Sequence, residues 1–170
     1  MSEPQRRDDR TGRTATPLVG PWHTVGHRVH AELEFPIEVT FAYDPGDPWA
    51  VRVSFGQFGQ SVDWTLSREL LHCGTRTACG EGDVQLWPLR DRDRRGGRRG
   101  GGHGGRHGGR VRIRLGGTGF PVLVDVDRAA LCAWLSATFH AVPAGSERER
   151  IDWAAEAAHI GPGVHPDSED

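Results

Sequence analysis

Two pairs of side chains in this sequence have types and spacings that are typical of reactive sites. His103 and His107 are four residues apart, a spacing that suits a metal ion when the segment is helical. The glycines on both sides disfavour a helix, so we expect only adventitious metal binding there. His72 and Cys73 are adjacent, but adjacent residues on a short helix point in different directions. We therefore predict a buried, unreactive Cys73 and no Cys–His nucleophile.

Four aspartates form the remaining candidate for catalytic chemistry, at Asp44, Asp47, Asp63 and Asp83. A carboxylate cluster can hold a metal ion or transfer protons. Each of these aspartates lies beside a predicted turn or strand edge, where aspartate commonly bonds to nearby backbone. We predict structural roles for all four. The sequence then offers no catalytic, cofactor-binding or metal-binding residue, and we predict that the protein is not an enzyme.

The segment from Arg90 to Arg110 has a binding chemistry of its own. It holds eight arginines and two aspartates, a net charge of +6 in a chain whose net charge is −2. Guanidinium groups between glycines can reach phosphates or carboxylates, and the segment has no aromatic residue to stack on bases. A flexible loop that binds polyanions or acidic proteins and a solvated expansion without function both remain open. The candidate contacts are Arg95, Arg98, Arg99, Arg106 and Arg110.

The composition places the protein among small, single-domain globular proteins. The chain has 170 residues and three cysteines, which show neither CxxC spacing nor the even number of a disulfide framework. Its first residues are polar and charged, and no apolar run approaches the length of a membrane span. We expect a cytoplasmic protein without membrane insertion.

Alternating apolar residues predict a succession of strands and two helices. The predicted strands cover residues 28–35, 37–43, 49–55 and 62–66 in the first half, and 75–78, 84–88, 111–115 and 122–126 in the second. Each half ends in a helix, over 68–73 and 128–140, with Ser67 and Asp127 as N-caps and Gly74 as a left-handed end of the first. The pattern predicts two successive units, each with four strands followed by a helix (ββββα).

This order predicts an α+β fold in which two antiparallel sheets pack with helices. A short C-terminal helix is expected over 152–160, with Trp153, Ala157 and Ile160 on one face. We expect a disordered tail over residues 1–25, one domain over 26–160 that carries the 90–110 segment as a flexible insertion, and a loose acidic tail over 161–170.

Three motifs occur in a fixed order: YDPGDPWAV at 43–51, VDWTLSRELL at 62–71 and GDVQLWP at 82–88, followed by VPAGSE at 142–147 and IDW at 151–153. In this order and spacing they resemble the SsgA-like sporulation and cell-division proteins. The resemblance runs from about His30 to Ile160. The family usually has a short connection after Trp87 and Pro88, where this chain inserts the 90–110 segment.

The resemblance implies a compact, whirly-like fold assembled as a homo-oligomer, a trimer. It also implies a non-catalytic adaptor at division septa that engages FtsZ, the tubulin-like division protein, and other family members. The Asp-Pro turn and two tryptophans are then candidate contacts: Asp44, Asp47, Trp49 and Trp87. A second hypothesis assigns the protein a different function. In it, the protein is a single-stranded nucleic-acid-binding module that uses whirly-like sheets and the arginine segment.

Overall fold

The structure is a computed structural model that describes residues 19–31, 33–57, 59–89, 109–117, 119 and 121–150. Within these residues the strands precede a helix twice along the chain. The elements are β1 (Trp22–His30), β2 (Leu33–Tyr43), β3 (Ala50–Gln57), β4 (Gln60–Ser67), α1 (Arg68–Gly74), β5 (Val84–Pro88), β6 (Arg110–Leu115), β7 (Val122–Asp127), α2 (Arg128–Ala141) and the 3-10 turn η2 (Glu147–Arg150).

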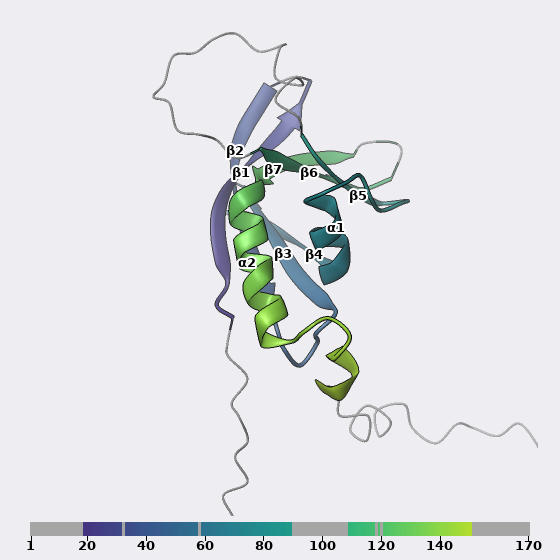
Figure 1. The fold of residues 1–170 in the computed structure, drawn as a ribbon. Helices are drawn as coiled ribbons and strands as arrows, with labels where there is room; N and C mark the ends of the chain where they lie inside the picture. The colour runs from purple at the N-terminus through teal and green to yellow at the C-terminus, as the bar shows by residue number, and fades with distance from the viewer. Residues whose placement is uncertain are drawn as a thin grey trace, which may run out of the picture.

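The strands form one curled antiparallel sheet in the order β4-β3-β2-β1-β7-β6-β5. The two halves of the chain are joined where β1 pairs with β7, with His27 opposite Asp125 and Val29 opposite Leu123. Helix α1 contacts β4 and β5, and α2 contacts β6 and β7, so both helices cover the same face of the sheet (Figure 1). We predicted two sheets; the β1–β7 pairing makes them one.

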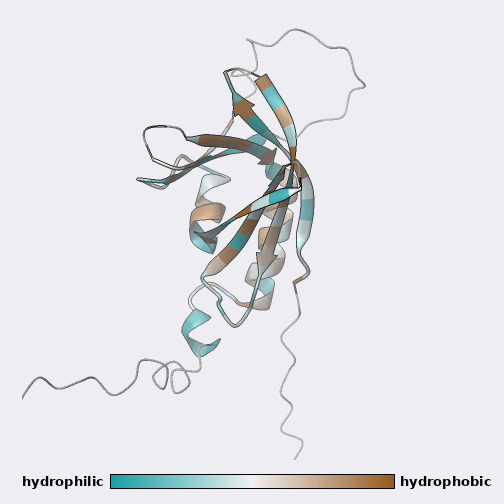
Figure 2. Cartoon of the chain, turned by 180° about the vertical axis from the view of Figure 1, so that it is seen from behind, coloured by the Kyte–Doolittle hydropathy of each residue, from teal (hydrophilic) through white to brown (hydrophobic). Residues whose placement is uncertain are grey.

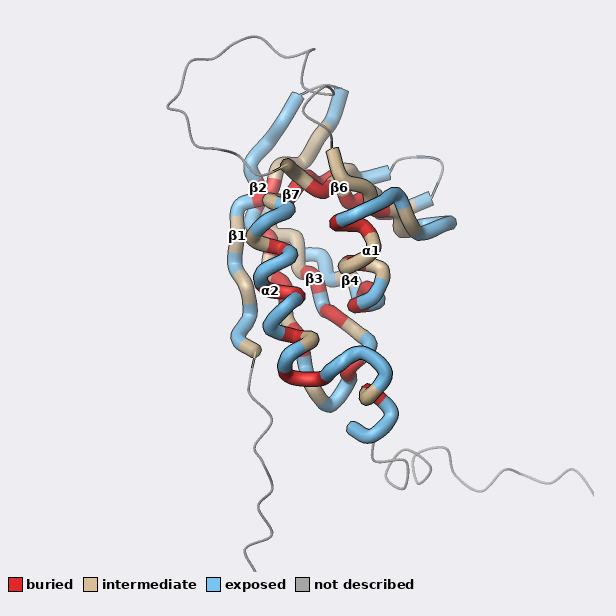
Figure 3. Tube along the Cα trace, viewed as in Figure 1, coloured by how far each residue is buried: buried red, intermediate tan, exposed pale blue. Residues whose placement is uncertain are grey.

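The core lies between this face of the sheet and the two helices. Period-two alternation along the strands directs every second side chain inward. Figure 2 shows hydrophobic and hydrophilic residues in brown and teal bands along the strands. Buried residues lie on β3, β6 and α2, whereas the far end of the β1–β2 hairpin is exposed (Figure 3). The large aliphatic and aromatic side chains with almost no exposure are Phe41, Leu71, Leu86, Ile113, Leu131 and Leu135.

Both predicted helix N-caps are confirmed. The Ser67 hydroxyl accepts a hydrogen bond from the Leu70 N–H at 3.3 Å, and the Asp127 carboxylate accepts one from the Ala130 N–H at 2.8 Å. The predicted left-handed end at Gly74 is wrong, because Gly74 is the last helical residue and the cap is Thr75 in the right-handed region. Gly74 is instead required by packing, since a Cβ there would overlap the side chain of Leu86.

The predicted strand over 28–35 is in fact the end of a hairpin. His30 pairs with Leu33 across a two-residue connection in which Ala31 has a φ of +47°. An alanine at such a position lacks the Asn-Gly or Asp-Gly signature of tight hairpins, so no residue type there indicated the turn. Pro36 does not interrupt β2, because the pairing with β3 starts only at Glu38 and the strand has β1 as its single neighbour there.

Order also begins earlier than the predicted boundary near Gly26. Trp22 stacks on Phe41 with ring centroids 4.9 Å apart, and the Trp134 indole N–H donates to the Gly20 carbonyl at 3.0 Å. These tertiary contacts hold a segment that has no periodicity of its own. The predicted strand at 75–78 is absent from the described residues, where only Cys79 bridges to Leu86. The second half therefore contributes three strands, and the ββββα repeat is incomplete.

Some of the predicted segments fall outside the described residues. They are the N-terminal tail up to residue 18, the arginine segment over 90–108, the helix over 152–160 and the acidic tail over 161–170. Among the described helices, none has both the length and the apolar character needed to cross a bilayer. The predicted likeness to the whirly fold stays a prediction.

Candidate functional site

The connection between β2 and β3 is a fixed turn that carries two of the predicted contact residues. The Asp44 carboxylate accepts from the Gly46 N–H at 2.8 Å, and the Asp44 carbonyl accepts from the Asp47 N–H at 3.0 Å. The Asp47 carbonyl in turn accepts from the Ala50 N–H at 3.2 Å. The Asp44 side chain thus bonds to nearby backbone as predicted, whereas Asp47 takes part in the turn through its main chain, and both residues remain exposed.

Trp49 stands at the end of this turn with 38% of its surface exposed. The turn is anchored from beneath, because the Trp49 carbonyl accepts from the Arg68 N–H at 2.7 Å and the Tyr43 hydroxyl lies 3.4 Å from the Pro48 carbonyl oxygen. An exposed indole on a rigid support is the arrangement that protein contacts favour. The structure therefore keeps Trp49 as a contact candidate.

The other predicted contacts are not gathered around Trp49. Trp87 is half-buried on β5, opposite Arg112, on the face of the sheet away from the helices. Arg110 belongs to β6, where its guanidinium donates to the Glu34 carboxylate at 2.8 Å and lies 4.0 Å from Asp125. Arg110 is therefore a residue of β6 and not of the loop, and its role as a contact stays a prediction. Arg95, Arg98, Arg99 and Arg106 lie outside the described residues.

Beneath the turn lies a buried arginine that we did not predict. Arg68 is 1% exposed, and its guanidinium donates to the Tyr43 hydroxyl at 2.9 Å and to the Glu147 carboxylate at 2.7 Å. It also donates to the Thr138 and Val142 carbonyls at 3.1 and 2.9 Å at the end of α2, where the Thr138 carbonyl also accepts from the Val142 N–H at 3.0 Å. The Phe139 ring lies 4.2 Å from the guanidinium carbon.

This arrangement, which we call the Arg68 junction, is made of Arg68, Tyr43, Glu147 and the end of α2. It ties the β2–β3 turn and the start of α1 to the C-terminal part of the described chain. The sequence signal for it was indirect: Arg68 stands within the VDWTLSRELL motif at the same position, relative to its helix, as Arg128. Nothing in the sequence separated the buried arginine from the exposed one.

Electrostatics at the junction keep Glu147 charged although it is buried. Burial by itself raises the pKa of the Glu147 carboxyl, but hydrogen bonds from its own N–H, the Gly145 N–H and Arg68 outweigh burial and leave the pKa below its ordinary value. Burial raises the pKa of Tyr43, with Arg68 opposing it. Nearby on α1, burial and then the Arg76 charge lower the pKa of His72.

We expect stability to fall in two steps as the pH is lowered. Because the folded-state pKa of His72 lies below the ordinary 6.5, the unfolded chain takes up its proton first, and stability declines as the pH falls below about 6.5. The Glu147 contribution is fully present above the ordinary pKa of 4.5 and is lost as the pH falls through the lower folded value. Urea unfolding midpoints between pH 8 and pH 3 measure both steps.

Two single variants assign the steps to these residues. His72→Gln should flatten the upper part of the profile and leave the lower part, and Glu147→Gln should do the reverse. If the profile of Glu147→Gln kept the full slope of the parent below pH 4.5, the charge assigned to Glu147 would be wrong.

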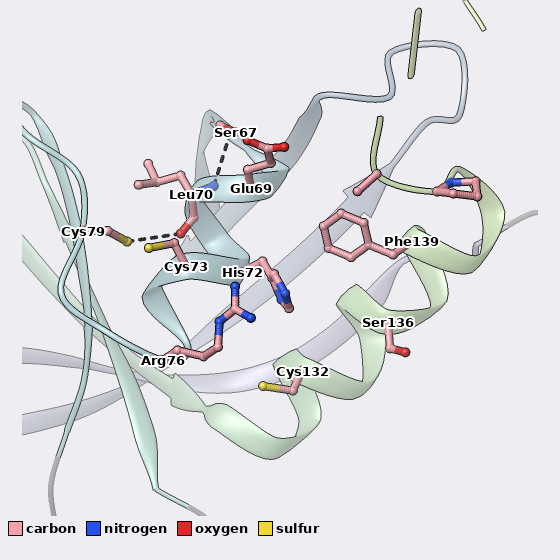
Figure 4. A pocket seen from close by; sticks show the side chains of 12 residues that line it. Ser67, Glu69, Leu70, His72, Cys73, Arg76, Cys79, Cys132, Ser136 and Phe139 are labelled. Carbon is pink, nitrogen blue, oxygen red and sulfur yellow. Dashed lines mark hydrogen bonds between the residues drawn. The ribbon is translucent and has the colours of Figure 1, made fainter. Parts of the chain in front are cut away.

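A second surface feature is an open groove of about 830 Å³ between α1 and α2. Figure 4 shows Cys73, Leu70 and His72 on its α1 side and Cys132, Ser136 and Phe139 on its α2 side. Cys73 was predicted to be buried but is half-buried at this groove. Its neighbour Cys79 bonds to the Leu70 carbonyl at 3.4 Å, and burial together with Cys73 raises the pKa of Cys79 to about 12.

The pairings considered for catalysis are not assembled in the described part of the chain. Asp63 lies on β4, at one end of the strand order, and Asp83 precedes β5, at the other end. No cluster of three or more histidine, cysteine, aspartate or glutamate residues within the described ranges is arranged to bind a metal ion. His103 and His107 lie outside those ranges. What the structure offers is a rigid turn and a groove.

The fold and these features define a β-rich scaffold that carries an exposed turn and an open groove. The chain belongs to the SsgA family, described as Streptomyces sporulation and cell division protein SsgA, whose sequence pattern matches residues 37–147. That range includes the exposed turn, both helices and the Arg68 junction. The resemblance drawn from the motifs is thereby confirmed.

Relatives with established names agree with this assignment. The sporulation-specific cell division protein SsgB of Frankia casuarinae is 34% identical over 124 residues, which cover 72% of this chain and 77% of that protein. SsgB of Streptomyces coelicolor is 32% identical over 133 residues, 78% of this chain and 87% of that protein.

Solved structures of relatives share the fold. The SsgA-like sporulation-specific cell division protein of Thermobifida fusca aligns with a TM-score of 0.67 at 28% identity, covering 82% of this chain and 93% of that one. An SsgB structure, from work linking SsgB mutations to longitudinal cell division during sporulation of Streptomyces coelicolor, aligns with a TM-score of 0.63, also at 28% identity, and covers 76% and 93% of the two chains.

Proposed function

We propose that this protein is a non-catalytic adaptor in sporulation-associated cell division, which acts in the cytoplasm at division septa and recruits or regulates division proteins there. Support for the division role comes from the family match over residues 37–147 and from relatives named as sporulation-specific cell division proteins. The adaptor mechanism is our inference from the surface. In this mechanism the protein binds other proteins and catalyses no reaction.

The observation that carries the mechanism is the exposed Trp49 on its anchored turn. An indole at the surface contributes most to the free energy of binding when a partner covers it. It then leaves water without losing much conformational freedom. The hydrogen bonds of Asp44 and Asp47 and the Arg68 N–H hold the turn in place before binding. Preorganisation of this kind lowers the ordering cost of association.

The first partner to test is FtsZ, followed by other members of the family. We also propose that the chain self-associates as a trimer. Support for self-association comes from exposed apolar side chains on the strands, including Val25, Leu33 and Val62 at 60% exposure each, and from the two sheet edges, β4 and β5. Sedimentation velocity of the full chain measures the oligomer directly.

Trp49→Asp should weaken binding to the division partner by at least about tenfold while the fold remains intact. The substitution removes the apolar anchor and places a charge in the contact, and it leaves the buried network beneath the turn in place. Binding of the full chain to purified FtsZ, by interferometry, measures the affinity, and a fluorescent fusion measures enrichment at septa.

Val122→Asp is the matched control, because it puts the same charge on an apolar side chain of nearly the same exposure, 37% against 38% for Trp49. Val122 lies on β7, where it pairs with Leu115 of β6, and β7 is three strands away from β3 in the sheet order. Parent-like affinity for Trp49→Asp would exclude the turn as the contact. If the parent protein neither bound FtsZ or a family member nor gathered at septa, the adaptor function itself would be wrong.

Binding of single-stranded nucleic acid stays a prediction, and it has less support than the adaptor function. Four of its five arginines lie outside the described residues, and the fifth, Arg110, is paired with Glu34. A titration of single-stranded DNA at two salt concentrations decides it, because phosphate contacts give a steep salt dependence.

A further inference from the structure

The groove between α1 and α2 has an apolar floor that no described residue covers. Leu70 and the half-buried Cys73 form part of one wall, and Phe139 and Cys132 form part of the other (Figure 4). Its volume of about 830 Å³ is in the range of a site that holds several side chains. An apolar groove between two helices suits the apolar face of a third helix.

We propose that residues 151–160 of this same chain dock in the groove as an amphipathic helix. Pro143 and Ala144 line one end of the groove, and the described chain ends only a few residues later, at Arg150. The segment that follows is therefore attached to this end of the groove by a short stretch of chain. Covalent attachment over so short a distance gives it an effective concentration far above that of a separate protein.

The sequence of the segment fits the groove in length and pattern. Ten helical residues span about 15 Å, against about 21 Å for the fourteen residues of α2. Trp153, Ala157 and Ile160 follow one another at spacings of four and three, which places them on one side of a helix. That side would face the apolar floor.

Charge complements the apolar match. Arg76 is exposed at the groove and has no ion-pair partner within the described part of the chain. Asp152 and Glu156 lie on the flank of the predicted helix, beside its apolar side. Their carboxylates can approach Arg76 when the apolar side faces Leu70 and Phe139. The docked segment would also screen the His72 and Cys132 side chains from solvent.

Disulfide trapping in the full-length chain tests the proposal. Ala157→Cys places a thiol on the apolar side of the segment, and the native Cys132 supplies its partner on α2. Diamide oxidises the two thiols to a disulfide and takes up their two hydrogens, so the bond forms only where the sulfurs meet. In most molecules we expect an intrachain disulfide between Cys132 and the thiol introduced at position 157, identified by mass spectrometry of nonreduced peptides.

Ala155→Cys is the matched control, since position 155 lies on the opposite side of the same helix. We expect it to cross-link to Cys132 at least about tenfold more slowly than Ala157→Cys. Equal rates at the two positions would contradict docking in the proposed orientation. A covalent dimer in place of the intrachain product would show that a second copy fills the groove, and would overturn the proposal.

Alkylation of Cys132 provides a second measurement without a new cysteine. Trp153→Asp in the full chain should release the segment and raise the rate of Cys132 alkylation by at least about fivefold. Ala155→Asp introduces the same charge on the outer side and should leave the rate unchanged. Parent-like alkylation of the Trp153 variant would show that the segment does not cover the groove.

Discussion

Replacing Arg68 with methionine is expected to lower the free energy of unfolding by about 3–5 kcal/mol. Methionine fills most of the volume but leaves the Glu147 carboxylate buried without its guanidinium. It also removes the Arg68 donor to the Val142 carbonyl and one of the two donors to the Thr138 carbonyl. An unpaired buried charge is far more destabilising than the loss of one exposed ion pair. Urea unfolding monitored by circular dichroism measures the loss.

Arg128→Met is the matched control for this variant. Arg128 also starts a helix, but it is exposed, and we expect its replacement to change stability by about 0.5 kcal/mol or less. A double variant, Arg68→Met with Glu147→Leu, should recover part of the loss because no charge stays buried. A loss below about 1 kcal/mol for Arg68→Met would show that the junction does not hold the fold together.

Gly74→Ala is expected to destabilise the protein by about 1–3 kcal/mol, although alanine is the better helix former. The new Cβ would overlap Leu86, which is fully buried on β5, so α1 must move away from the sheet. Propensity alone predicts a gain of about 1 kcal/mol, and the sign of the measured change therefore separates the two effects.

Gly20→Ala provides the comparison, because a Cβ at Gly20 meets nothing within 4 Å. We expect this variant to unfold at the same urea concentration as the parent. If Gly74→Ala were equally neutral, the close approach of α1 to β5 would be wrong. Movement of α1 would also be visible as faster hydrogen exchange in the Arg68–Gly74 helix.

Most strands and both described helices were predictable because their signals are local. Alternating valines and phenylalanines specify strands such as β3 and β7, and Ser67 and Asp127 cap helices with their own side chains. The Ala31 turn and the strand around Pro36 were missed, because there the partner strand and not the residue type decides the conformation.

Among the candidate contacts, the exposed turn was predictable because its residue types are typical of turns. Asp44, Asp47 and Trp49 form the exposed turn that the sequence indicated. Arg68 was missed because arginine is rarely buried, and its partner Glu147 lies 79 residues away. Arg110 was assigned to a binding loop, but Glu34 on β2 fixes it to the sheet. Contacts between residues so distant in sequence leave no periodic signal.

The pairing of β1 with β7 has a consequence for synthesis of the chain on the ribosome. Strand β1 is complete at His30, but its second partner starts at Val122. At about 5–20 residues per second, one edge of β1 stays open for roughly 5–20 seconds while the intervening chain is made. Arg68 likewise awaits Glu147. The first half thus emerges with an unpaired strand edge and an arginine that lacks its carboxylate, and an unpaired edge on an incomplete chain can pair with other chains.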